Sequence, residues 1–240
     1  MPRTARDVRN PSVLLRDYLG LVRADYVVEM RDGVRIRVRH GTTDKGVVKE
    51  VFLLDHYQFA LPHLKPGSVV VDIGAQIGVF SVYVSCRGPG NLTVHSFEPM
   101  KENYSLLRKN LDLNQLKNVT PHNAAVTAEP GKFRLYLSAD NTGMHSLYGE
   151  SDSFEEVEGV GFNELYDSLK IDRCDVLKLD CEGAEYDILR VARPEVLERT
   201  GAIIMEYHDE SRLPELVARL EQARFAVEVF KDHPMLYARR

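Results

Sequence analysis

Short apolar runs alternate with amphipathic stretches along the chain from about residue 66 onward. Short apolar runs are typical of buried strands, and the amphipathic stretches have the period of a helix that packs one side against a sheet. This alternation predicts an α/β fold with a mostly parallel sheet and helices on both faces. The expected strands are residues 69–73, 92–97, 119–123, 175–179 and 202–205.

The remaining patterns predict the helices, a loop and the end of the sheet. Residues 226–230 and 235–238 predict a closing hairpin whose last strand is antiparallel to the others. Residues 133–137 predict a strand that leads into a loop at 141–153, where Gly, Ser and Asn are frequent, and this loop is a candidate lid. Helices are expected over 78–86, 101–113, 184–191 and 213–223.

The first part of the chain has a different pattern. Residues 1–65 predict a helix over 13–21, a hairpin around Gly33 and a second helix over 48–61. We interpret them as an N-terminal extension that caps a single domain formed by residues 66–240.

The strongest local motif is VVVDIGAQIG at residues 69–78, a buried strand that leads into a glycine-containing turn and a helix. Gly74 and Gly78 allow a tight turn and the close approach of a ligand, and a helix N-terminus presents free N–H groups. The motif lacks both the GxGxxG of dinucleotide sites and the GxxxxGK of phosphate loops. Asp72 precedes the turn, where its carboxylate attracts a cationic amino acid group and repels a pyrophosphate.

A second signal is Glu98, which with Pro99 follows the expected strand 92–97. An acidic residue at the tip of the second strand of such a fold can accept hydrogen bonds from both hydroxyls of a ribose. The alternative is that Glu98 is a solvated cap of the next helix.

A third signal is DVLKLDCEGAE, where a buried strand delivers Asp180, Glu182 and Glu185 to its carboxyl end. Ligands of open parallel sheets bind at that edge. Such carboxylates can deprotonate a hydroxyl or bind a divalent cation, and their mutual repulsion raises a pKa. Lys178 is expected to pair with one of them, and Glu185 is expected on the solvated surface of the following helix.

Together these blocks resemble the FkbM family of methyltransferases that depend on S-adenosyl-L-methionine (SAM). The resemblance extends from about residue 66 to residue 208, and it implies a Rossmann-like class I methyltransferase fold with a seven-stranded sheet. Members mostly methylate hydroxyl oxygens of sugars, polyketides or related natural products and release S-adenosyl-L-homocysteine (SAH). The blocks that carry the resemblance are VVVDIGAQIGVFS, VHSFEPMKENYSLLRKNLDLN, NVTPHNAAV, DVLKLDCEGAEYDIL and IIMEYH.

The resemblance also implies roles for single residues. The turn after the first strand would hold the methionine part of SAM, Glu98 the ribose, and Asn123 with Ala124 the adenine. Asp180 and Glu182 would face the transferred methyl group. Gln76 departs from the family pattern, which has Asn there. The implied cofactor-binding residues are Asp72, Gly74, Ala75, Gln76, Gly78, Glu98, Pro99, Asn123, Ala124 and Asp180.

Methyl transfer to a hydroxyl requires a group that removes the proton. Carboxylates and histidines at the ends of the fourth and fifth strands are candidates, and the candidate lid adds one histidine. A divalent metal bound by Asp180, Glu206 and His208 is chemically allowed, but the sequence has no paired-histidine spacing and we predict no metal site. The candidate catalytic residues are Asp180, Glu182, Glu206, His208 and His145.

Composition limits the partners and the compartment. The formal net charge is −5, which disfavours a nucleic-acid partner because phosphate binding depends on clustered Lys and Arg. Residues 31–39 alternate Arg with apolar residues, which is typical of an exposed hairpin strand or, as an alternative, an anion-binding surface. No membrane span or secretory signal is predicted. Cys86, Cys174 and Cys181 have no paired spacing, so we expect a cytoplasmic protein.

The acceptor remains open at this stage. The leading hypothesis is O-methylation of a small molecule or glycan, and the alternatives are N-methylation of a peptide or small amine and a SAM-binding module without catalysis. An oxidoreductase that uses a nicotinamide cofactor is disfavoured because the dinucleotide motif is absent. The sequence leaves a homo-oligomer open.

Overall fold

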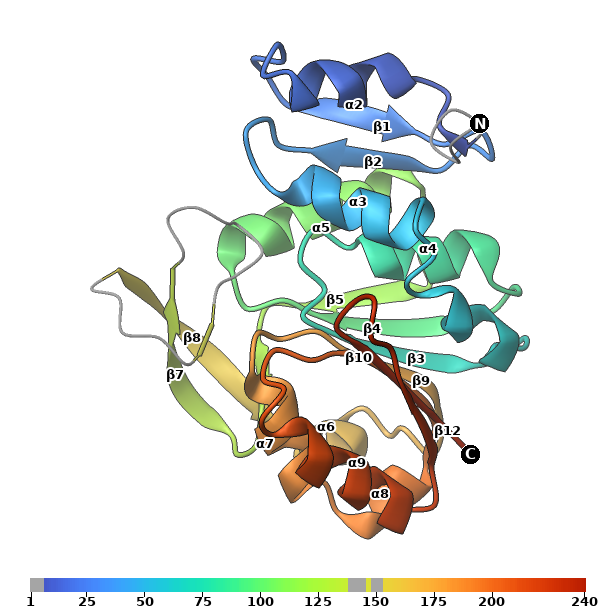
Figure 1. The fold of residues 1–240 in the computed structure, drawn as a ribbon, viewed down its shortest axis with the longest axis vertical. Helices are drawn as coiled ribbons and strands as arrows, with labels where there is room; N and C mark the ends of the chain where they lie inside the picture. Colours follow the sequence, from blue (N-terminus) through green and yellow to red (C-terminus); the bar gives the residue numbers. More distant parts are fainter. Residues whose placement is uncertain (1–6, 138–145, 148–152) are drawn as a thin grey trace.

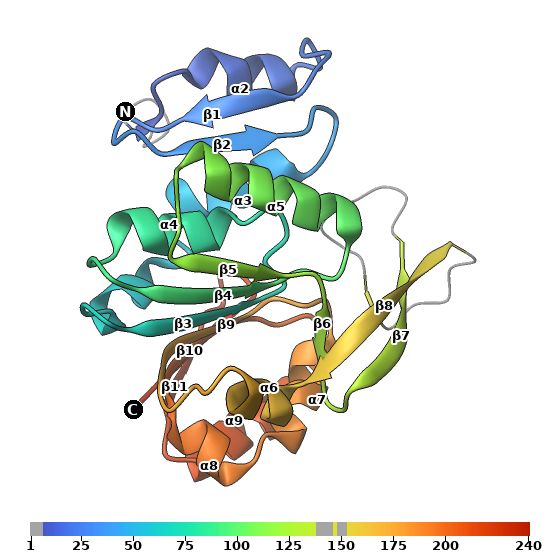
Figure 2. The same ribbon diagram turned by 180° about the vertical axis from the view of Figure 1, so that it is seen from behind.

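The computed structural model describes residues 7–137, 146–147 and 153–240. Its centre is a seven-stranded sheet (Figures 1 and 2). In spatial order the strands are β11 (Ala226–Val229), β12 (Met235–Arg239), β10 (Thr200–Glu206), β9 (Cys174–Leu179), β3 (Val69–Ile73), β4 (Thr93–Phe97) and β5 (Val119–His122). The strands are parallel except β12, which is antiparallel to both neighbours. The predicted Rossmann-like architecture is confirmed.

Helices cover both faces of this sheet because successive residues of each strand point to opposite sides. Val70 and Val176 belong to the apolar core on one face, whereas Val71 and Leu177 belong to the core on the other. The first face is covered by α3 (Asp44–Phe52), α4 (Val79–Arg87) and α5 (Lys101–Leu113), and the second by α6 (Phe162–Ser168), α7 (Ala184–Val191), α8 (Pro194–Glu198) and α9 (Leu213–Gln222).

A small second sheet lies beside the strand ends and was only partly predicted. It joins β6 (Ala125–Thr127), β8 (Phe154–Gly161) and β7 (Gly131–Tyr136), and β7 contains most of the expected strand 133–137. The prediction missed β8, whose acidic positions alternate with Val157 and with glycines instead of forming an apolar run. The candidate lid at 141–153 lies outside the described residues except for Ser146, Leu147 and Ser153.

The N-terminal part contains the predicted hairpin, formed by β1 (Tyr26–Glu29) and β2 (Arg35–Val38), with α2 (Pro11–Tyr18) packed on it. The prediction of one helix over 48–61 is wrong. Helix α3 ends at Phe52, and a 3₁₀ helix, η1 (Gln58–His63), follows. The break has a local cause, because Asp55 adopts a left-handed backbone (φ 56°) and an α-helix cannot continue through it.

The N-terminal part shares an apolar core with the sheet domain. Ile36, Val48 and Phe52 belong to the same buried cluster as Val70 and Phe80. The helix α3 therefore packs beside α4 over the first face of the sheet (Figure 1). Within the described residues no helix is long and apolar enough to cross a membrane.

Candidate active site

The turn after β3 is closed by backbone contacts with β4 and with the segment after β9. The amides of Gly74 and Ala75 donate to the carbonyl of Phe97 over 3.0 and 2.9 Å. Gly74 has φ 74°, and a Cβ on it would lie 1.7 Å from the carbonyl oxygen of Asp180. Only glycine fits there.

Asp72 lies behind this turn and not on the cleft wall. Its buried carboxylate accepts a hydrogen bond from the Ser81 hydroxyl at 2.6 Å and faces the Lys178 ammonium at 3.3 Å. Lys178 also donates to the carbonyl of Gly74 at 2.7 Å. Asp72 therefore fixes the lysine and helix α4 that support the turn.

Glu98 is buried at the tip of β4, with 5% of its surface exposed, so it is not a solvated helix cap. One carboxylate oxygen accepts the amide N–H of Gln76 at 2.8 Å, and the other accepts that of Met100 at 2.9 Å. Burial raises the pKa of Glu98 to about 7, although these N–H groups oppose the shift. The side-chain amide of Asn123 supports the same segment by donating to the carbonyls of Glu98 and Pro99, each at 2.9 Å.

The end of β9 brings a buried cation between two carboxylates. The Lys178 ammonium lies 3.3 Å from oxygens of both Asp72 and Asp180, which confirms the expected pairing. Burial opposes the charge on Lys178, but the two carboxylates outweigh it and raise its pKa. Tyr57, from the segment before η1, donates its hydroxyl over 3.4 Å to Oδ2 of Asp180, the oxygen that also faces Lys178.

His208, just after β10, lies among three carboxylates. Its Nδ1 is 2.8 Å from Glu185, and its Nε2 is 3.5 Å from Glu182 and 4.0 Å from Asp180. The expectation of a solvated Glu185 is wrong: the side chain points inward from the first turn of α7 and is fully buried. Burial disfavours the imidazolium, but the contact and charge of Glu185 dominate and raise the pKa of His208 to about 9.

Three carboxyl groups of this region, Glu182 among them, have raised pKa values. Burial, reinforced by Asp180, raises the pKa of Glu206 to about 8. Burial also raises the pKa of Glu182 to about 7, with the charge of Asp180 adding to it. Glu50, on α3, is raised by burial and by Asp180. Carboxylates that lie close together resist simultaneous ionisation, so part of this rim is protonated near neutral pH, and a bound cation would favour the ionised forms.

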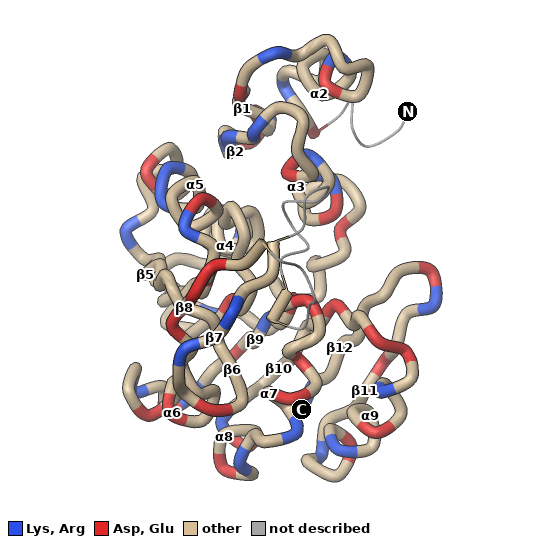
Figure 3. Tube along the Cα trace, turned by 90° about the vertical axis from the view of Figure 1, so that its left-hand side faces the viewer, with Lys and Arg blue, Asp and Glu red and all other residues tan. Residues whose placement is uncertain are grey.

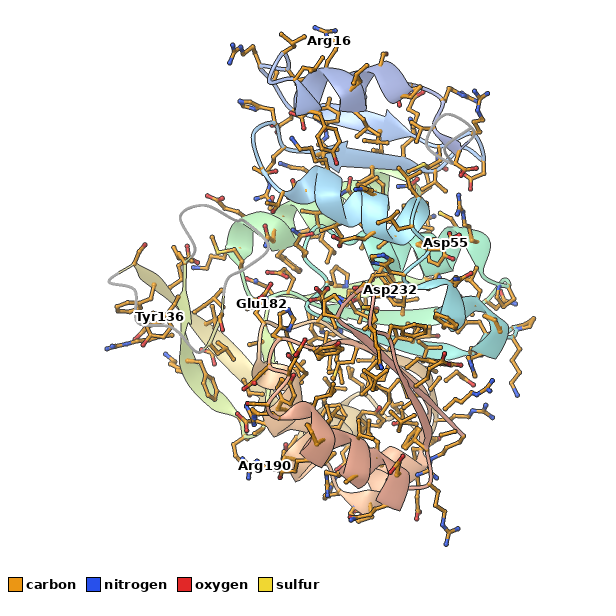
Figure 4. The ribbon with its side chains drawn as sticks, viewed as in Figure 1. Arg16, Asp55, Tyr136, Glu182, Arg190 and Asp232 are labelled. Atoms are coloured by element: carbon orange, nitrogen blue, oxygen red, sulfur yellow. The ribbon has the colours of Figure 1, made fainter. Side chains whose placement is uncertain are left out.

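These groups meet in one cleft of about 450 Å³, which is within the range of pockets that hold small molecules. Figure 3 shows acidic positions near the ends of β9 and β10, and Figure 4 labels Glu182 between α3 and α7. Of the predicted residues, Gly74, Ala75, Gln76, Glu98, Pro99, Asp180, Glu182, Glu206 and His208 line the cleft.

Four predicted cofactor residues do not line it: Asp72, Gly78, Asn123 and Ala124. Gly78 instead caps helix α4 with a left-handed backbone (φ 83°). Neighbouring Ala125 and Val126 line the cleft in place of Asn123 and Ala124. His145 lies outside the described residues.

Sequence reasoning missed the residues that the N-terminal part contributes. Thr43, Glu50 and Tyr57 line the cleft although they lie far along the chain from its motifs. Glu50 and Tyr57 fall within the expected helix 48–61, but an amphipathic pattern gives no information about the surface that a helix covers, and Thr43 lies before that range.

One group of metal-ligating side chains occurs among the described residues. Ligand atoms of Asp180, Glu182 and His208 all lie within 4.8 Å of one another. The metal ligands considered from the sequence were Asp180, Glu206 and His208, so the structure groups Glu182 with His208 and Asp180 in place of Glu206.

Comparison with known proteins adds to this geometry. Residues 72–227 match the methyltransferase FkbM domain, which covers the turn, Glu98 and the acidic strand ends. The chain belongs to the FkbM methyltransferase family. The match confirms the resemblance to the FkbM family that the sequence blocks indicated, and the chain is a methyltransferase.

Two curated methyltransferases align with this chain over about three quarters of their own length. The 31-O-demethyl-FK506 methyltransferase FkbM of Streptomyces tacrolimicus is 27% identical over 201 residues, which cover 70% of this chain and 76% of the relative. The hexuronic acid methyltransferase AglP of Haloferax volcanii is 24% identical over 191 residues, with 78% and 76% covered.

Solved structures share the fold. A Streptococcus mutans protein whose crystal structure was determined in complex with SAH superposes with a TM-score of 0.50 at 13% identity. The superposition covers 78% of this chain and 96% of that one. At this identity the likeness shows the fold alone.

Proposed function

We propose that this FkbM-family protein transfers a methyl group from SAM to a hydroxyl oxygen of a sugar, a glycoconjugate or another natural product. The observation that carries the proposal is the single cleft, which joins a glycine turn and buried Glu98 to a rim of carboxylates and His208. We call Gly74, Ala75, Gln76, Glu98 and Pro99 the cofactor half of this cleft. The acceptor half comprises Glu50, Tyr57, Glu182, Glu206 and His208.

The cofactor half suits SAM in its polar groups. The side-chain amide nitrogen and oxygen of Gln76 are buried at the cleft wall and have no hydrogen-bond partner among the described residues. An unsatisfied buried amide is costly, and an amino acid group offers both the donor and the acceptor that it lacks. Glu98 keeps acceptor capacity beyond its two backbone contacts and would hold the ribose hydroxyls.

The charges of the cleft suit a cationic cofactor. SAM supplies a methyl group on a sulfonium, which carries a positive charge beside its ammonium group. Asp180 at the boundary between the two halves, together with the ionised forms of Glu182 and Glu206, gives a negative potential that favours such a cation over a pyrophosphate. The FkbM domain match supports a methyl donor of this kind, and a protein of the same fold has been crystallised with SAH, the demethylated product of SAM.

Glu206 is the residue that we assign to proton removal. It lines the cleft at the end of β10 and lies outside the ion pairs that engage Asp180, Glu182 and His208 among the described residues. Burial and Asp180 raise the pKa of Glu206 to about 8, so the ionised form that accepts the proton of an acceptor hydroxyl becomes the main form as the pH rises through about 8. The protein's other task is to align the two reactants, which the shared cleft achieves.

The acceptor class rests on the relatives and on the chemistry of the rim. One relative is named for 31-O-demethyl-FK506 and another for hexuronic acid, which are oxygen-rich natural compounds. Carboxylates and a tyrosine hydroxyl at the acceptor half are typical partners of hydroxyl groups.

The three free thiols of the chain fit a protein that works in a reducing compartment such as the cytoplasm.

The direct test uses SAM with a deuterated methyl group. The protein is incubated with this SAM and a panel of glycosides, polyketides and peptides, and mass spectrometry locates the transferred methyl. We expect the label on hydroxyl oxygen. A label on nitrogen, or none on any member while SAH binding is intact, would contradict the acceptor class.

A further inference from the structure

We propose that Asp180, Glu182 and His208 bind a divalent metal ion at the floor of the acceptor half. Each residue offers one ligand atom, and the three atoms lie within 4.8 Å of one another. They come from different places in the sequence, namely the end of β9, the turn after it and the end of β10. The sheet topology thus creates a three-ligand set that neither strand contains alone.

An observation outside this trio points to a ligand on His208. The fully buried Glu185 holds Nδ1 of the imidazole at 2.8 Å, so the ring is fixed with Nε2 directed toward the two carboxylates. Histidines that bind metals almost always donate the other ring N–H to a carboxylate or carbonyl, which orients the ring. Glu185 stands in the position of that orienting carboxylate.

The spacing of the ligand atoms is close to that of a metal site. Two neighbouring ligands of an ion about 2.1 Å away lie about 3.0 to 3.4 Å apart in octahedral or tetrahedral geometry. The Nε2 atom of His208 lies 3.5 Å from Glu182 and 4.0 Å from Asp180. All three ligand atoms lie within 4.8 Å of one another, so binding of an ion would draw the three groups closer together.

The two carboxylate oxygens of Asp180 have different partners, which supports this arrangement. Lys178 and Tyr57 engage Oδ2, at 3.3 and 3.4 Å, whereas Oδ1 is the oxygen that faces His208. Asp180 can therefore bind an ion without giving up its contact with Lys178. The cleft side of the trio is open, which leaves coordination positions for water or an acceptor oxygen.

Two carboxylates and one imidazole favour a first-row divalent ion such as Mn²⁺. If the proposed O-methylation holds, an ion here would bind the acceptor hydroxyl and ease loss of its proton to Glu206. This part of the inference rests on the proposed function. Binding of the ion itself does not.

The test is a titration of the tag-free protein with Mn²⁺ alone, followed by electron paramagnetic resonance. We expect one bound ion per chain and a spin-echo modulation from one imidazole nitrogen. The variant His208→Gln should lose this modulation. Both His208→Gln and Asp180→Asn should weaken binding at least about tenfold, and Glu185→Gln should weaken it about tenfold. The matched control His40→Gln changes an exposed histidine that follows strand β2, and this variant should bind like the unaltered protein.

Circular dichroism confirms that each variant is folded, and calorimetry measures SAH binding separately. Absence of binding by the folded protein, or Mn²⁺ bound without nitrogen modulation, would overturn the metal site and indicate that His208 only pairs with the carboxylates. Intact SAH binding and methyl transfer in that case would leave the proposed function standing. Mn²⁺ binding through His208 without methyl transfer would support the site and count against the function.

Discussion

The two halves of the cleft are built in different ways. The cofactor half comes from two strand-to-helix turns, in which Gly74 to Gln76 and Glu98 to Pro99 each follow a single strand. The acceptor half combines Glu50 and Tyr57 of the N-terminal part with residues that follow β9 and β10, which are more than 100 residues further along the chain. Local backbone geometry therefore determines the first half, and long-range packing determines the second. Changes in the cofactor half should therefore alter the affinity for the cofactor, and changes in the acceptor half should alter the rate of methyl transfer.

The largest effect is expected from Glu206→Gln. Without its base, the protein should lose about 10² to 10⁴-fold in kcat, whereas the dissociation constant of SAM should change less than about twofold. Steady-state kinetics and calorimetry measure the two quantities. The control Glu210→Gln changes an exposed carboxylate nearby and should leave both unchanged. A kcat within about threefold of the original would remove Glu206 from the reaction.

Gly74→Ala should destabilise the fold by roughly 2 to 4 kcal/mol and abolish measurable SAM binding. The added Cβ would meet the carbonyl oxygen of Asp180 at 1.7 Å, and φ at this position is 74°. Chemical denaturation gives the free energy of unfolding. Gly90→Ala is the matched control because a Cβ there has no atom within 4 Å. Equal stability of both variants would show that the turn is not constrained as described.

Glu98→Ala should weaken SAM binding by about 1 to 3 kcal/mol through lost hydrogen bonds to a carboxylate, with a smaller effect on kcat. Calorimetry with SAM and SAH measures the change. Glu102→Ala, on the exposed side of α5, serves as its control. Unchanged affinity would take Glu98 out of the site and erase the contrast between the two halves.

The smallest effect is a pH dependence of SAM affinity. Burial raises the pKa of Glu98 to about 7, so its carboxyl is mainly protonated at pH 6 and mainly ionised at pH 8. The ionised form is the better acceptor for ribose hydroxyls, so affinity should rise by up to about tenfold between these pH values. The dependence should flatten in Glu98→Gln, and a rise of the same size in that variant would assign it to another group.

The sequence predicts the fold and the cofactor half better than the acceptor half. Apolar runs mark the parallel strands, and Gly74 and Glu98 stand next to strands that can be recognised locally. Asp72 was assigned to the cofactor, but it packs against Ser81 and Lys178 below the turn, because a strand residue can face either side of the sheet. Glu185 was expected in solvent but is buried. The prediction failed because its partner His208 lies 23 residues further along the chain, outside the local pattern.

Glu50 shows the limit most clearly. Nothing in the helix that carries it indicates a site, and its position at the cleft depends on the shared core of α3 with the sheet domain. Such contacts arise only when the whole chain is folded. The break of that helix region at Asp55 was missed for a related reason, because a left-handed residue other than glycine leaves little trace in an apolar pattern.

The central claim is that the ends of β3, β4 and β9 meet around one adenosyl compound. A crystal structure of the protein with SAH tests it most directly. We expect the ribose hydroxyls within hydrogen-bonding distance of Glu98, the homocysteine beside Gly74 and Gln76, and the sulfur facing Asp180 and Glu206. SAH bound elsewhere, or absent from an open cleft at saturating concentration, would contradict it.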